Sequence, residues 1–124
     1  MSAATYNFTI EQGTSFSLPI TWTDTNNNPV DLTGYTARMM LRVKYADSDG
    51  ATPIVSLTTE NGRISLGGSA GTIAISLDAA TTQAIGVPAT ADGKYLYDLE
   101  LVDGAGKVKR LLQGEVAISQ EVTR

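Results

Sequence analysis

In residues 35–44, YTARMMLRVK, apolar side chains alternate with side chains that are polar at every position but Met40. One phase holds Tyr35, Ala37, Met39, Leu41 and Val43, and the other holds Thr36, Arg38, Met40, Arg42 and Lys44. Successive side chains of a β-strand point to opposite faces, so this stretch predicts a strand with one buried and one outward face. Met40 is the one large apolar residue on the outward phase.

The same two-residue period recurs at short intervals along the chain. The apolar phases are Phe16, Leu18, Ile20 and Trp22; Ile73, Ile75 and Leu77; and Tyr95, Tyr97, Leu99 and Leu101. Repeated short amphipathic strands indicate an all-β domain. Pro19 falls on an outward phase, which predicts an edge strand or a bulge because proline has no N–H for a ladder. Leu111 and Leu112 break the alternation of residues 107–119, which predicts a bulge or a strand covered on both faces.

Turn signals separate these strands. Residues 24–29 (DTNNNP) and 67–71 (GGSAG) indicate loops. Asn61-Gly62 lies between two short apolar runs and predicts a hairpin, as do residues 103–106 (DGAG) between the last two strands.

One short segment looks helical. Asp78 is placed to cap a helix that crosses between two strands near residues 78–85. The run Gly93-x-Tyr95-x-Tyr97, which follows it, resembles the tyrosine-corner stretch of immunoglobulin-like domains. We therefore predict an immunoglobulin-like antiparallel β-sandwich of about seven or eight strands with one short helical crossover.

The length of 124 residues suits one domain with a core large enough to fold without disulfides, and the chain has no cysteine. We predict a flexible N-terminal arm at residues 1–5, a single sandwich at residues 6–119 and a C-terminal tail at residues 120–124.

Catalytic chemistry has few candidates. The chain has neither histidine nor cysteine, which removes the commonest nucleophile–base pairs and zinc ligands. Asp98 and Glu100 share a strand face, but a carboxylate pair needs a substrate-sized cleft, and we predict no enzyme and no cofactor. Asp24-x-Asn26-x-Asn28 and Asp47-x-Asp49-Gly50 imitate calcium loops. They lack the full ligand set and read as Asx-rich turns, with a weak structural cation as the alternative.

Composition also limits the classes of binding partner that we expect. The net charge is −4 and the basic residues are spread out, with Lys107 and Lys109 read as solvent-facing, so we predict no nucleic-acid partner. No apolar stretch approaches the ~20 residues that span a bilayer, so no membrane partner is expected. The strand phases place Trp22, Tyr35, Tyr95 and Tyr97 in the core and leave Tyr6 and Tyr45 exposed, which disfavours an aromatic sugar platform.

Four segments together resemble a known class of protein: residues 28–39 (NPVDLTGYTARM), 71–76 (GTIAIS), 93–99 (GKYLYDL) and 109–114 (KRLLQG). They resemble small structural proteins of tailed phages and prophages and, more distantly, the N-terminal domain family of siphophage upper baseplate proteins. Asn28 departs from that family's usual glycine. The chain stops at Arg124, where an upper baseplate protein would continue, so the expectation is an anchoring module alone.

The resemblance implies a virion structural protein, assembled in the bacterial host cytoplasm. It would act as a non-catalytic tail or baseplate adaptor in a symmetric assembly or homo-oligomer with other virion proteins. A capsid decoration protein and a carbohydrate-binding host-adhesion module are the alternatives. As the assembly contact we predict the outward stripe Arg38, Met40, Arg42 and Lys44, although a plain solvated face fits the same pattern.

Overall fold

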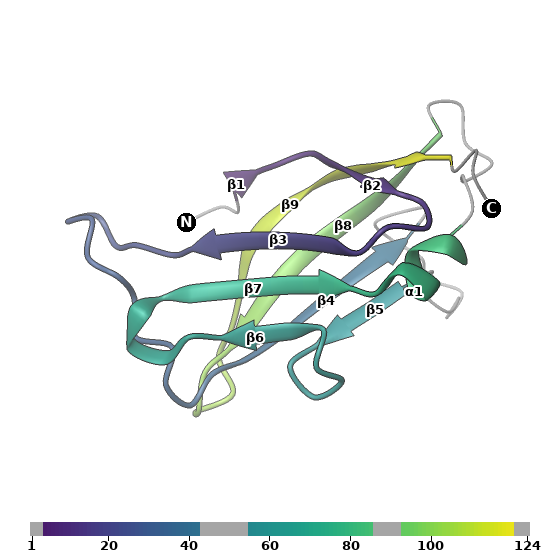
Figure 1. Ribbon diagram of the computed structural model, residues 1–124. Helices are drawn as coiled ribbons and strands as arrows, with labels where there is room; N and C mark the ends of the chain where they lie inside the picture. Colours follow the sequence, from purple (N-terminus) through teal and green to yellow (C-terminus); the bar gives the residue numbers. More distant parts are fainter. Residues whose placement is uncertain (1–3, 43–54, 86–92, 121–124) are drawn as a thin grey trace.

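The alternating segments form strands in the computed structural model of the protein, which describes residues 4–42, 55–85 and 93–120 (Figure 1). The larger sheet contains β1 (Ala4–Thr5), β2 (Phe8–Glu11), β4 (Thr36–Arg42), β5 (Val55–Thr58), β8 (Lys94–Val102) and β9 (Val108–Ser119). The smaller sheet contains β3 (Phe16–Thr21), β6 (Ile64–Leu66) and β7 (Thr72–Leu77). The all-β sandwich predicted from the sequence is confirmed.

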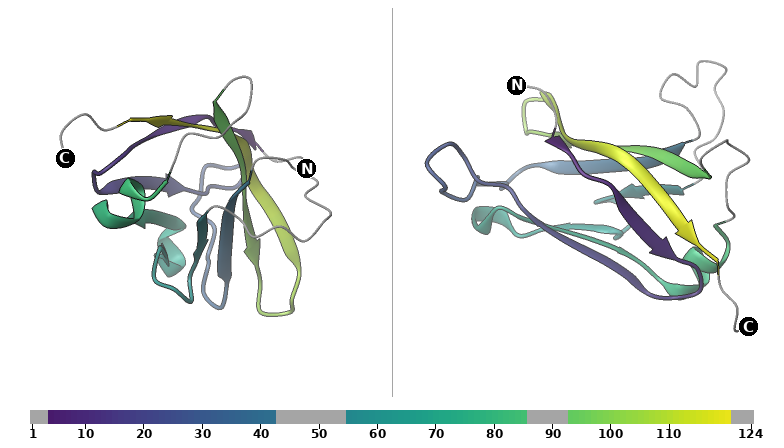
Figure 2. Two further views of the ribbon diagram at one scale, coloured as in Figure 1. Left: turned by 90° about the vertical axis from the view of Figure 1, so that its right-hand side faces the viewer. Right: turned by 90° about the horizontal axis from the view of Figure 1, so that it is seen from above.

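The strand order is β1-β9-β8-β4-β5 in the larger sheet, with β2 also pairing β9, and β3-β7-β6 in the smaller sheet. Along the sequence the chain changes sheet four times, after β2, β3, β5 and β7. Figure 2 shows the two sheets as facing layers, with α1 (Ala79–Gln83) at one end. A 3₁₀ turn, η1 (Gly68–Ala70), leads into β7.

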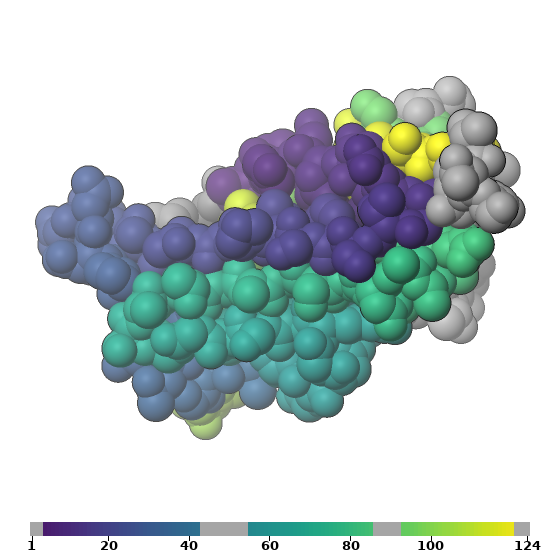
Figure 3. All heavy atoms as spheres, in the orientation of Figure 1, coloured from purple at the N-terminus to yellow at the C-terminus, as the bar shows by residue number. Residues whose placement is uncertain are grey.

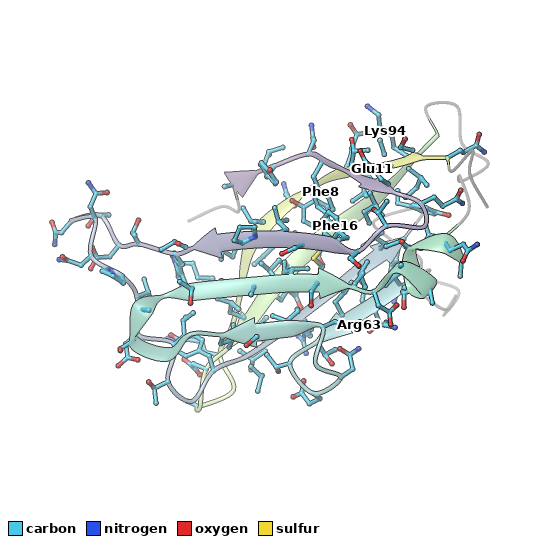
Figure 4. The ribbon with its side chains drawn as sticks, viewed as in Figure 1. Phe8, Glu11, Phe16, Arg63 and Lys94 are labelled. Carbon is cyan, nitrogen blue, oxygen red and sulfur yellow. The ribbon has the colours of Figure 1, made fainter. Side chains whose placement is uncertain are left out.

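The core consists of the inward phases of both sheets. Its most deeply buried side chains are Ile10, Leu32, Met39, Leu41, Leu57, Ile73, Ile75, Leu99, Leu101, Thr82 and Val116. Phe8 and Phe16 close the side of the sandwich between β2 and β3, where their rings stack with centroids 5.4 Å apart (Figure 4). Tyr97 meets Phe8 edge-on at 4.9 Å and donates its hydroxyl to the Tyr6 carbonyl oxygen.

Three local predictions are confirmed. Asp78 caps α1, because its carboxylate accepts the Thr81 N–H at 2.8 Å. Residues 103–107 form the turn between β8 and β9, with Asp103 Oδ1 accepting the N–H groups of Ala105 and Lys107 at 2.9 Å each. A bulge lies at Leu111, since Leu99 pairs Leu112 while Glu100 already pairs Arg110.

The N-terminal edge departs from the predicted antiparallel arrangement. β1 and β2 both run parallel to β9, which is possible because the rest of the domain supplies the long connection that a parallel pair needs. Ala4 and Thr5, predicted as part of an arm, form β1, and residues 1–3 and 121–124 lie outside the described residues.

Asn61-Gly62 does not form a hairpin, so that prediction is wrong. The turn joins β5 of the larger sheet to β6 of the smaller one. A turn motif specifies only the local backbone, here with Gly62 at φ 81°, and says nothing about which sheet the following strand joins.

Candidate assembly surface

The outer face of the larger sheet carries most of the predicted stripe. Arg38, Met40 and Arg42 all point outward from β4, which buries Ala37, Met39 and Leu41 instead. Lys44, the fourth predicted member, lies outside the described residues. We use the name outer face for the surface formed by the outward side chains of Arg38, Met40, Arg42, Asp98, Glu100 and Arg110.

The strand register places the stripe of β4 beside charged side chains of β8 and β9, and the charges together form a grid. Arg38 pairs Glu100 across β4 and β8, and Met40 pairs Asp98. On the other side of β8, Glu100 pairs Arg110 of β9. The carboxylates of β8 therefore lie in a column between two columns that contain arginines.

Two ion pairs form within this grid. Arg38 Nε lies 2.8 Å from Glu100 Oε1, and Arg110 Nε lies 3.3 Å from Asp98 Oδ2. Arg42 Nη2 reaches the Met40 sulfur at 3.5 Å. The two-residue spacing of Asp98 and Glu100 predicts that they share a face, but their pairing with these arginines follows only from the strand register.

The carboxyl of Asp98 is partly buried on the outer face. Burial raises the pKa of its carboxyl above the ordinary value of 3.8, and the neighbouring Glu100 carboxylate raises it further. Arg110, Arg38 and Arg42 act in the opposite direction without cancelling these effects. The charged form of Asp98 is therefore less favoured in the folded protein than that of a free aspartate.

Among the described residues β5 is an end strand of the larger sheet, and side chains occupy the backbone groups of its outer edge. Asn61 Oδ1 accepts the Thr58 N–H at 3.1 Å, and Asn61 Nδ2 donates to the Ser56 carbonyl oxygen at 3.0 Å. Arg63 Nη1 donates to the same Ser56 oxygen at 3.0 Å, from the position between β5 and α1 labelled in Figure 4. One side-chain amide thus makes the two hydrogen bonds that a neighbouring strand would make.

Pro19 interrupts the outer edge of β3, which agrees with the edge-strand alternative of the sequence prediction. β3 is the outermost strand of the smaller sheet, and Pro19 pairs Ala74 of β7. Trp22 N–H donates to Gly71 O, so the even-numbered residues of this strand direct their backbone groups toward β7. The Pro19 nitrogen therefore faces the free edge, where it offers no donor to an added strand.

The calcium-like loop at residues 24–28 is held by its own hydrogen bonds. Asp24 Oδ1 accepts the N–H groups of Asn26 at 2.8 Å and of Asn28 at 3.0 Å, which is the Asx-turn arrangement. Within residues 4–42, 55–85 and 93–120, no group of three acidic side chains is placed to hold a metal ion. The second loop, with Asp47 and Asp49, lies outside the described residues.

The aromatic residues divide into two groups. Tyr95 and Tyr97 are buried, as predicted, and burial raises the pKa of Tyr95 above 10.0. Tyr6 is 45% exposed, also as predicted. Trp22 and Tyr35 are only partly buried, at the end of the sandwich opposite α1, and Tyr45 lies outside the described residues.

In the described part of the chain, no helix has the length and apolar character needed to cross a membrane. No protein-family model matches the sequence, and no curated protein matches it.

Proposed function

We propose that this protein is a non-catalytic structural module of a tailed-phage virion, an adaptor of the tail or baseplate that docks through the outer face. One observation carries the choice of surface: two sheet edges are blocked, β5 by Asn61 and Arg63 and β3 by Pro19. Association by strand addition is therefore disfavoured at these edges, whereas the outer face presents charges in a regular grid.

The chemistry of the outer face suits a protein partner of matching charge pattern. Exposed ion pairs are individually weak, so exchanging Arg38–Glu100 for an intermolecular pair costs little. A complementary column of charges sets the register of docking more than its strength. Met40, at the centre of the grid between Arg38 and Arg42, supplies an apolar contact.

Strand order supports an immunoglobulin-like assignment within the same proposal. An immunoglobulin sandwich places strands G, F and C in one sheet, with C′ added beside C in variable-type domains, and B, E and D in the other. The order β9-β8-β4-β5 facing β3-β7-β6 corresponds to that arrangement. The virion assignment itself rests on the sequence resemblance of residues 28–39, 71–76, 93–99 and 109–114.

Particle composition tests the location. Quantitative mass spectrometry of purified virions, referred to the major capsid protein, is expected to give a few copies per particle in a multiple of the tail symmetry. A copy number comparable to the capsid protein would replace the adaptor with a decoration protein, and absence from particles would overturn the virion proposal.

Charge reversal tests the surface. Arg38→Glu/Arg42→Glu is expected to fold but to be lost from particles. The control Ser17→Glu/Thr72→Glu adds two glutamates to exposed positions on β3 and β7 of the smaller sheet and is expected to be incorporated. Incorporation of the arginine variant together with loss of the control would assign docking to the other sheet.

A further inference from the structure

The end of the sandwich opposite α1 carries an open aromatic site, separate from the outer face. Trp22 follows β3 at the base of the loop at residues 24–29, which projects beyond both sheets in Figure 3. The ring of Tyr35 meets the Trp22 ring edge-on, with centroids 6.4 Å apart and planes at 80°. Both side chains are only partly buried, which leaves part of their surface available to a ligand.

Lys109 lies over Trp22 because of the bulge at Leu111. Lys109 pairs Leu101, whose side chain is fully buried, so it occupies the inward phase of β9 rather than the solvent-facing position predicted from the sequence. Its ammonium lies 5.1 Å from the centroid of the Trp22 ring. A lysine in this phase replaces the apolar residue that would otherwise cover Trp22.

Two hollows meet at Trp22 and Lys109, each of about 310 Å³. One extends past Tyr35 to Asp103 and Lys107 in the β8–β9 turn, and the other extends to Asp24 in the projecting loop. Together they form a trough with an aromatic surface in the middle and charged groups of both signs at its ends.

Hydrogen-bonding groups along the trough are available to a ligand. Asp24 and Asp103 each use Oδ1 to hold their own turns, and their Oδ2 atoms have no partner among the residues that the structure describes. Within the same residues, the Tyr35 hydroxyl and the Lys107 ammonium make no hydrogen bond. The trough thus offers acceptors and donors on either side of an aromatic ring.

We propose that this trough binds a neutral saccharide chain, a function beyond the assembly role of the outer face. A sugar ring has an apolar face that packs against the part of Trp22 left uncovered by Lys109 and the core, and hydroxyl groups that both donate to carboxylates and accept from ammonium groups. An anionic ligand would meet Asp24 and Asp103, a cationic one would meet Lys107 and Lys109, and an apolar one would leave all four charges desolvated.

Trp22 is the only tryptophan of the chain, so its fluorescence and its single indole N–H resonance report on the trough directly. The probes are trisaccharides of glucose (maltotriose and cellotriose) and of N-acetylglucosamine, with a glutamate hexapeptide as the anionic comparison. We expect saturable shifts of the indole resonance with at least one trisaccharide, at a Kd of about 1 mM or below, and none with the peptide.

Lys109→Met keeps the aliphatic stem over Trp22 and removes the ammonium, and it is expected to weaken binding about tenfold or more through the loss of a charge-assisted hydrogen bond. The matched control Lys94→Met, at the other end of β8 and labelled in Figure 4, is expected to bind as the wild type does. Absence of a saturable shift with all three trisaccharides, a response to the peptide alone, or equal binding by Lys109→Met would overturn the proposal.

Discussion

Asn61→Ala tests the idea that side chains block the edge of β5. The substitution removes three hydrogen bonds: Oδ1 accepts the N–H groups of Thr58 at 3.1 Å and Arg63 at 3.0 Å, and Nδ2 donates to Ser56 O at 3.0 Å. It leaves the backbone bond from Asn61 N–H to Thr58 Oγ1 in place. Ser56 O also keeps its bond from Arg63 Nη1, so Thr58 N–H becomes the exposed unpaired donor of the edge.

The expected loss of stability follows from these bonds. Asn61 is exposed, so water replaces much of each lost interaction, and about 0.5 kcal/mol per bond is the appropriate low end. Three bonds give about 1.5 kcal/mol in the free energy of unfolding, which corresponds to roughly 5 °C in Tm for a domain of this size. The opened edge should also associate with other chains more than the wild type does.

Thermal and urea unfolding measure the first effect, and sedimentation velocity over a range of concentrations measures the second. Asn26→Ala is the matched control, because the Asn26 side chain is exposed and makes no hydrogen bond with other described residues. The opposite result is that Asn61→Ala matches Asn26→Ala in both Tm and urea midpoint and associates no more than the wild type does. That result would show that the Asn61 side chain neither stabilises the domain nor protects the edge of β5.

Two further substitutions test other features of the larger sheet. A Cβ on Gly114 would overlap the Tyr6 carbonyl oxygen, so Gly114→Ala should displace the N-terminal strands from β9 and lower the free energy of unfolding by about 1–3 kcal/mol. Gly104→Ala, with its nearest contact at 3.9 Å, is the control and should change the free energy of unfolding by less than about 0.5 kcal/mol. The raised pKa of Asp98 means that the folded state holds this proton more tightly than the unfolded chain does, so stability falls as the pH rises through 3.8 and then through the folded pKa. Asp98→Asn should therefore raise the free energy of unfolding at neutral pH, and this gain should disappear as the pH falls below 3.8. Urea titrations at several pH values measure the difference between the two proteins, and a difference that is constant with pH would contradict the raised pKa of Asp98.

The candidate surface was predictable only in part. The alternation of residues 35–44 places Arg38, Met40 and Arg42 on one face, since the pleat fixes which side chains point together. Their partners Glu100, Asp98 and Arg110 come from strands more than fifty residues away along the chain, and the register that brings them together is a property of the assembled sheet.

Local sequence patterns were enough to predict the features that depend on neighbouring residues: the strand faces, the Asp78 cap and the Asp103 turn. Each of these follows from backbone geometry and hydrogen bonds within a few residues. Three features follow from the assembled sandwich alone: β5 and β6 join different sheets, β1 and β2 run parallel to β9, and the Leu111 bulge turns Lys109 inward over Trp22. These outcomes depend on pairings between distant strands, which are set by packing both sheets around one core and which no local pattern specifies.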